Sequence, residues 1–107
     1  MQILLIRHGA TASNLKRLYL GRSDEPLCEA GVEQARARFA AGLPAAEKVF
    51  VSPLLRCRQT AAILFPDREP IVIETFAEID FGRFEGRSHD KLMRDEPAYA
   101  RWLDSRG

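Results

Sequence analysis

Residues 2–7 are nearly all apolar and lead directly into His8. An apolar run of this kind is typical of a strand buried on both faces of a parallel sheet. Shorter apolar runs at 48–52 and 71–74 predict a second and a third strand. The stretches between the runs exceed the dozen or so residues that a crossover between parallel strands needs. The hydrophobic pattern therefore predicts three strands with helices between them.

Helical periodicity fills the stretches between these runs. Apolar residues recur at spacings of three and four from Val32 to Leu43, which predicts an amphipathic helix over 29–42. The serine-proline pair at 52–53 favours a second helix that begins there and continues to Leu64. The alternation of strands and helices implies right-handed crossovers and an α/β fold with helices on both faces of a mainly parallel sheet. Shorter helices are expected at 13–18, capped by Ser13, and near 88–95 and 97–105.

Length and charge narrow the class of protein. The 107 residues fit one modest domain, so 1–107 is treated as a single domain. Sixteen basic and fifteen acidic residues nearly cancel, which argues against nucleic acid as a partner. Cys28 and Cys57 lack metal-ligand spacing, so both are expected as reduced thiols. No segment approaches the ~20 apolar residues of a membrane span, so a soluble cytoplasmic protein without a membrane partner is expected.

Polar residues with phosphate chemistry follow each predicted strand. Arg7 and His8 end the first strand, Arg56 lies in the first turn after the second, and Glu78 follows the third. Carboxyl ends of parallel strands meet at the edge where open α/β sheets bind ligands, so these residues are expected to converge. Arginine forks and helix amides hold a phosphoryl group, which His8 could attack in line. Glu78, among apolar neighbours, is the candidate acid for the leaving oxygen.

Taken singly, each of these residues has an ordinary explanation at a protein surface, and only their common location favours a site.

Three motifs then match a known family in order: Leu5 to Thr11 with Asn14, the segment 52–60, and the segment 78–86. In these motifs the chain resembles the histidine phosphatase superfamily, which includes the cofactor-dependent phosphoglycerate mutases. The resemblance implies a phosphoglycerate mutase-like fold with three layers, α/β/α, whose C-terminal part is missing from this chain.

The resemblance also implies a role for each matching residue. His8 corresponds to the histidine that is phosphorylated, and Glu78 corresponds to the proton donor. Arg7, Asn14 and Arg56 correspond to residues that bind phosphate. The phosphatase reaction implied by these residues needs no metal and no cofactor. Arg58 is expected on the surface of its helix instead.

A loop near the N-terminus narrows the resemblance to one branch of the superfamily. The loop looks like the one common among alpha-ribazole phosphatases, which act in cobalamin synthesis, and it implies a phosphate-binding role for Gly21. The implied substrate is a small phosphate ester, with alpha-ribazole 5′-phosphate as one candidate. The segment after Glu78 looks less like that of the mutases, so phosphoglycerate mutase is the second enzyme hypothesis. The loop residues are Tyr19, Gly21, Asp24, Pro26 and Leu27.

One departure from the family pattern matters. The family carries a second catalytic histidine on a later strand, whereas the other histidine here is His89, which is expected to be exposed at a helix start. The strand with that second histidine lies between the first two predicted strands in the family's sheet. Its absence leaves unpaired edges and apolar side chains exposed, and a truncated domain is expected.

Three hypotheses therefore compete. The leading one is a phosphomonoesterase that works through a phosphohistidine at His8. The second is a catalytically silent module that binds phosphate esters through its arginines. The third is an incomplete chain that pairs with a complementing polypeptide or forms a homo-oligomer to close its sheet.

Overall fold

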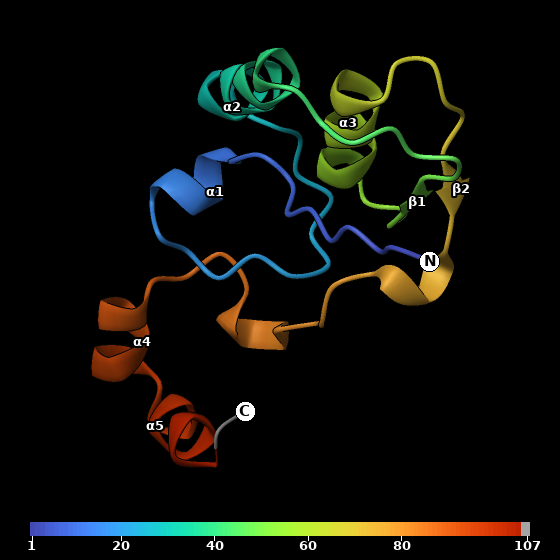
Figure 1. Cartoon of the computed structure of the whole chain (residues 1–107). Helices are drawn as coiled ribbons and strands as arrows, with labels where there is room; N and C mark the ends of the chain where they lie inside the picture. The colour runs from blue at the N-terminus through green and yellow to red at the C-terminus, as the bar shows by residue number, and fades with distance from the viewer. Residues whose placement is uncertain (106–107) are drawn as a thin grey trace. The chain divides into compact units, whose positions relative to one another are not determined.

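The computed structural model describes residues 1–105, so Arg106 and Gly107 of the predicted domain lie outside the described residues. Two compact units make up the chain. The first consists of residues 1–11 and 24–77, and the second consists of residues 12–23 and the chain from Glu78 onward. Figure 1 labels the elements of both units. No helix in the described part of the chain is long and apolar enough to cross a membrane.

The first unit contains a parallel β-α-β unit. Strand β1 (Phe50–Val51) pairs in parallel with β2 (Ile71–Val72), and helix α3 (Leu55–Leu64) connects the two strands. Main-chain hydrogen bonds extend the pairing by a residue on either side, from Ile71 N to Val49 O at 2.8 Å and from Ile73 N to Val51 O at 2.9 Å. A 3-10 turn, η1 (Glu74–Phe76), follows β2. A mixed α/β chain with a parallel sheet was predicted, and the structure confirms it.

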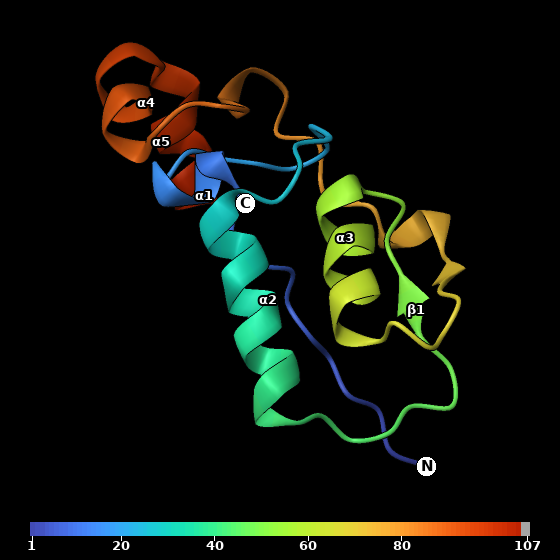
Figure 2. The same ribbon diagram turned by 90° about the horizontal axis from the view of Figure 1, so that it is seen from above.

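Helix α2 (Glu29–Ala41) packs against α3, and α3 in turn packs against β1. Figure 2 shows the two helices side by side in this unit. The bounds of α2 agree with the predicted 29–42, and Gly42 ends the helix with φ of 95°, a conformation that suits glycine. Phe39 of the predicted apolar face is exposed, whereas Ala35 is buried. A small core is formed by Val49, Val51 and Ala61, with Ala46, Cys57 and Phe65 packed against it.

The start of α3 differs from the prediction. The helix begins at Leu55, and Ser52 accepts a hydrogen bond from the amide of Leu54 at 3.3 Å instead of capping the helix. The amide of Leu55 donates to Oδ1 of Asp24 at 2.6 Å. A carboxylate from a distant loop thus supplies the acceptor at this helix start. Local sequence signals for an N-cap contain no information about such a partner.

The predicted first strand is wrong in this structure. Residues 1–10 form no strand, and the side chains of Ile3 and Leu5 are 76% and 90% exposed. Burial on both faces requires hydrogen-bonded neighbours and covering layers, whereas β1 and β2 here pair with each other. The expected exposure of apolar side chains in this segment is confirmed.

The second unit is held together by aromatic side chains. Helix α1 (Ala12–Leu15) is shorter than the predicted 13–18, because Arg17 adopts φ of 56°. A 3-10 turn, η2 (Gly82–Phe84), precedes helices α4 (His89–Asp95) and α5 (Pro97–Asp104), which pack together close to the predicted positions. Ser88 caps α4 by accepting from the amide of Lys91 at 3.2 Å. The ring cluster consists of Tyr19, Phe81, Phe84, Tyr99 and Trp102.

Tyr99 lies fully buried in this cluster and makes the stability of the second unit depend on pH in the alkaline range. Its hydroxyl is 2.6 Å from that of Tyr19 and 2.8 Å from Nδ1 of His89. Burial, with a smaller contribution from Tyr19, raises the pKa of Tyr99 from 10.0 to about 12. The native state therefore holds this proton more tightly than the unfolded chain. The resulting stability is complete below the unfolded pKa and is lost as the pH rises through the folded pKa.

Replacement of Tyr99 by phenylalanine is expected to flatten the pH dependence of stability in this alkaline range. Between pH 10 and about 12 the free energy of unfolding of the natural chain should fall more steeply than that of the variant. Urea unfolding at a series of pH values measures both slopes. Equal slopes would show that Tyr99 is not the titrating group.

Candidate active site

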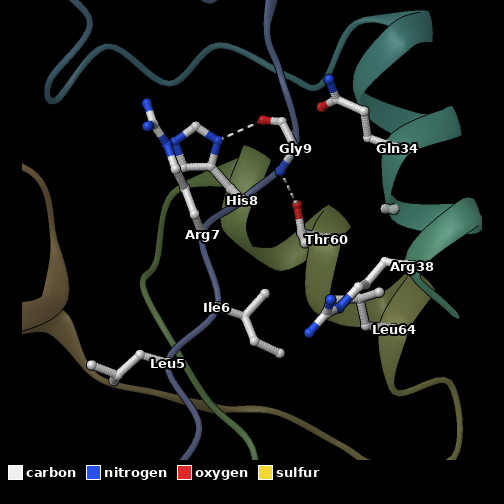
Figure 3. Close-up of a pocket in the computed structure, with 10 residues that line it drawn as sticks. Leu5, Ile6, Arg7, His8, Gly9, Gln34, Arg38, Thr60 and Leu64 are labelled. Atoms are coloured by element: carbon white, nitrogen blue, oxygen red, sulfur yellow. Dashed lines mark hydrogen bonds between the residues drawn. The ribbon is translucent and has the colours of Figure 1, made fainter. Parts of the chain in front are cut away.

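His8 follows the extended N-terminal segment of the first unit and is half-buried. Its Nδ1 atom lies 2.6 Å from the carbonyl oxygen of Gly9, and Figure 3 shows the ring turned toward that carbonyl. Because a carbonyl oxygen only accepts, Nδ1 must carry the hydrogen of this bond. In the neutral ring the lone pair is then on Nε2. The local backbone thus leaves on Nε2 of His8 the lone pair that a nucleophile needs.

The loop after His8 is tied to α3 through a buried hydroxyl. The amide of Gly9 donates to Oγ1 of Thr60 at 3.1 Å, and that hydroxyl donates to the carbonyl oxygen of Arg56 at 2.8 Å. Two of the predicted motifs are therefore connected by one side chain. Sequence reasoning did not single out Thr60, although its spacing of four residues from Arg56 places both on the same helix face.

The backbone of the same loop lies in direct contact with the backbone of the first turns of α2. A Cβ atom added at Gly31 would lie 2.0 Å from the carbonyl oxygen of Ala10, and one added at Gly9 would lie 2.6 Å from that of Gly31. The amide of Ala10 donates to Oε1 of Gln34 at 2.9 Å. The amide of Cys28 donates to the carbonyl oxygen of Ala10 at 3.1 Å. Glycine at two positions thus allows α2 to hold the loop that carries His8.

A pocket of about 290 Å³ adjoins His8 in the first unit. Both Arg7 and Arg38 line it, and none of the described residues that line it is acidic. Arg38 lies in the last turn of α2. A basic, carboxylate-free lining suits an anionic group. The lining, shown in Figure 3, consists of Leu5, Ile6, Arg7, His8, Gly9, Gln34, Ala35, Arg38, Thr60 and Leu64.

Arg56 is the second residue of α3 and is only 1% exposed. Arg58 is exposed on the same helix, as predicted. Arg56 is not among the described residues that line the pocket at His8, and the hydroxyl of Thr60 links its backbone carbonyl to the amide of Gly9. The predicted anion site at the helix amides is not available at Leu55, whose amide donates to Asp24. The guanidinium remains the candidate anion-binding group of this turn.

The other predicted site residues belong to the second unit. Asn14 lies in α1, and the amide of Gly21 donates to both carboxylate oxygens of Glu85, at 3.0 and 2.9 Å. Glu78 is exposed, and its Oε1 accepts from the amide of Ile79 at 3.3 Å. Because Ile79 is itself exposed, the apolar enclosure expected around the Glu78 carboxyl is not formed.

His89 is exposed at the start of α4, as predicted, and its ring hydrogen-bonds Tyr99.

The imidazole of His8 lies beside a basic pocket in a unit that contains a parallel β-α-β arrangement. This arrangement suits an α/β protein that handles phosphate groups. The chain belongs to the histidine phosphatase superfamily (branch 1), whose family model matches residues 3–107. This match confirms the resemblance drawn from the three motifs.

Curated relatives and solved structures agree with the family. An adenosylcobalamin/alpha-ribazole phosphatase of Escherichia coli is 36% identical over 109 residues, which cover 97% of this chain and 53% of that protein. A 2,3-bisphosphoglycerate-dependent phosphoglycerate mutase of a Methylobacterium species is also 36% identical and is covered over 49% of its length. The chain thus spans about half the length of the curated relatives it matches.

Crystal structures of two phosphatases resemble the chain closely. The alpha-ribazole phosphatase of Shigella flexneri aligns with a TM-score of 0.81 at 31% identity, over 92% of this chain and 51% of that one. A phosphoserine phosphatase of Entamoeba histolytica in complex with 3-phosphoglyceric acid aligns with a TM-score of 0.80 at 31% identity, over 91% and 49%. Both similarities confirm a phosphoglycerate mutase-like fold for this chain.

Proposed function

We propose that this chain provides the nucleophile and the phosphate-binding arginines of a phosphomonoesterase that acts through a phosphohistidine at His8. The observation that carries the proposal is the hydrogen bond between Nδ1 of His8 and the carbonyl oxygen of Gly9, at 2.6 Å. This bond fixes the ring as the tautomer whose Nε2 can attack. The basic pocket beside the ring supports an anionic substrate.

The proposed reaction has two steps. Nε2 of His8 attacks phosphorus, a phosphorus-nitrogen bond forms, and the ester bond to the leaving oxygen breaks. The carboxylic acid of Glu78 gives its proton to that oxygen, and an alcohol leaves. Water then attacks the phosphohistidine, Glu78 takes a proton from the water, and His8 is regenerated with release of inorganic phosphate.

Arg7 and Arg56 neutralise the charge that develops on the phosphoryl oxygens in both steps. Asn14 completes the proposed phosphate-binding set, as the family resemblance implies, whereas the amide of Gly21, which was also expected to bind phosphate, donates to the carboxylate of Glu85 instead. The best-supported substrate class is a small phosphorylated metabolite. Alpha-ribazole 5′-phosphate is the specific candidate, because phosphatases named for alpha-ribazole are among the curated relatives and the solved structures.

A covering polypeptide is part of this proposal. The N-terminal segment exposes apolar side chains, including Ile3 and Leu5. In the active form, further polypeptide, either a complementing chain or a second copy, is proposed to cover this segment. The mass of the assembly should therefore be measured under the conditions of each kinetic assay, to show whether a second polypeptide is bound.

The arginines of α3 provide a matched test of the proposed phosphate site. Arg56→Lys removes the fork that can bind two phosphate oxygens at once and is expected to weaken binding of inorganic phosphate by ~10-fold or more, since a charge-assisted bidentate pair is worth ~1.5–3 kcal/mol. Arg58→Lys makes the same change on the exposed face and should leave binding unaltered. Calorimetric titration with phosphate measures both affinities. Equal affinities in the two variants would exclude Arg56 from the site.

The same two variants also test which phosphate ester is the substrate. Release of inorganic phosphate from alpha-ribazole 5′-phosphate is compared with release from phosphoserine and 3-phosphoglycerate. Faster release from alpha-ribazole 5′-phosphate than from the other two esters would support the specific candidate. Release from each ester should fall in Arg56→Lys and be retained in Arg58→Lys, because the phosphate group is common to all three. Phosphate binding with no turnover of any ester would instead identify a silent binding module.

A further inference from the structure

The loop at residues 19–23 of the second unit lies against the segment 78–87, which includes Glu78. The amide of Gly86 donates to the carbonyl oxygen of Tyr19 at 2.7 Å, and the amide of Tyr19 donates to that of Arg87 at 3.0 Å. The rings of Tyr19 and Phe81 are 5.0 Å apart, measured between centroids. Two segments that are distant in the sequence are therefore joined through main chain and side chains.

Glu85 fastens the middle of this loop. One of its carboxylate oxygens accepts from the amide of Gly21 at 3.0 Å, and the other accepts from Gly21 at 2.9 Å and from Ser23 at 3.2 Å. Both oxygens of Glu85 are thus engaged with backbone amides, an arrangement that holds a loop in one conformation. This carboxylate is suited to a structural task and not to proton transfer.

Arg22 reaches from the same loop to the backbone of Glu78. Its Nε donates to the carbonyl oxygen of Glu78 at 3.1 Å. At the preceding loop residue, a Cβ atom added to Gly21 would lie 1.9 Å from the carbonyl oxygen of Ile79. Two consecutive residues of the loop therefore contact two consecutive carbonyl groups at the candidate acid.

We infer that Arg22 and Glu85 are positioning residues for the carboxyl group of Glu78. Residues 77–81 form neither helix nor strand, so no regular element fixes the direction of this exposed side chain. Glu85 holds the loop in place, and the loop carries Arg22. Arg22 in turn holds the carbonyl group of Glu78, which is bonded to the Cα atom that bears the side chain. The inference rests on the proposed function, because it assigns a purpose to the placement of the proposed acid.

The kinetic test compares two leaving groups. Arg22→Ala should lower kcat for an alkyl phosphate, whose alkoxide needs a proton, by ~10-fold or more, because a well-placed general acid contributes ~10²–10⁴-fold. For p-nitrophenyl phosphate, whose leaving group needs no proton, kcat should change by less than about 2-fold on the same argument. Lys16→Ala, which also removes a positive charge from an exposed site in this unit, is the control and should alter neither value. An equal loss for both esters would indicate a merely structural role and overturn the inference.

A second readout does not depend on turnover. By NMR relaxation, the order parameter of the Ile79 amide is expected to fall in Arg22→Ala and in Glu85→Gln and to stay unchanged in Lys16→Ala. An unchanged order parameter in both loop variants would overturn the inference even if the chain hydrolyses esters. If the natural chain has no turnover that depends on His8, the proposed function fails, and the order parameters alone decide whether the loop positions Glu78.

Discussion

Replacing His8 with alanine is expected to abolish phosphate ester hydrolysis and the formation of acid-labile phosphoprotein. Loss of the nucleophile removes the covalent intermediate, and removal of a catalytic nucleophile has cost about 10⁶-fold in kcat in a well-studied hydrolase. We expect a loss of at least ~10³-fold here, since binding alone sustains some residual rate. Quenching in alkaline detergent, in which phosphohistidine is stable, keeps ³²P from a labelled ester on the protein and measures the intermediate directly. Trapped label in the alanine variant, or turnover close to the rate of the natural chain, would refute the assignment of His8.

His89 offers the matched control for this experiment, because the sequence contains two histidines. Its ring is exposed and hydrogen-bonds Tyr99 through Nδ1. Asparagine can keep a polar atom near that position, so His89→Asn should preserve the fold of the second unit. Label incorporation in His89→Asn should equal that of the natural chain. A loss in both histidine variants would point to a general effect on folding, which circular dichroism of each variant would reveal.

Introducing alanine at Gly31 is expected to destabilise the first unit by about 2 kcal/mol or more, the range found for overpacked sites. The new Cβ would lie 2.0 Å from the carbonyl oxygen of Ala10 and 2.8 Å from its amide nitrogen. Both neighbours are backbone atoms, so no side-chain rotation relieves the overlap. In a domain of this size the melting temperature should fall by ~10 °C. The affinity for phosphate should fall as well, because Ala10 belongs to the loop that comes directly after His8.

The sign of this change makes the experiment decisive. Helix propensity alone predicts that alanine in place of glycine stabilises a helix by up to ~1 kcal/mol. Glu33→Ala, on the exposed face of the same helix, is the control and should shift stability by less than ~0.5 kcal/mol. Thermal unfolding followed by circular dichroism gives both values. A gain in stability at Gly31 would mean that α2 and the His8 loop do not approach as closely as the structure indicates.

Local patterns predicted those parts of the fold that local interactions determine. The spacing of apolar residues located α2, and the parallel pairing of β1 with β2 followed from two short apolar runs. Where a distant partner decides the outcome, the same patterns failed. The start of α3 depends on Asp24, which lies 31 positions away from Leu55. An apolar run at the N-terminus predicts a buried strand only if neighbouring strands and covering layers are available.

The candidate site shows the same division. Motif spacing identified His8 and Arg56, and the structure connects their segments through the side chain of Thr60. Thr60 itself was missed because a threonine inside a helix has an ordinary explanation: its hydroxyl bonds the carbonyl four residues earlier. The contacts of Arg22 and Glu85 were also missed, since they join segments 56 and 64 positions apart. Tertiary hydrogen bonds of this kind leave no periodic signal in a sequence.

The bridging hydroxyl of Thr60 has a consequence for the lifetime of the reactive state. It has one proton, which it gives to the carbonyl oxygen of Arg56, and it therefore receives the amide of Gly9 on a lone pair. The direction of both hydrogen bonds is therefore fixed, and the bridge exists only while this turn of α3 is helical. Each transient opening of that turn removes the link between α3 and the loop beside the imidazole and leaves only the contacts with α2 to hold the loop. Fraying of a helix end, usually a harmless fluctuation, would here loosen the proposed nucleophile at intervals.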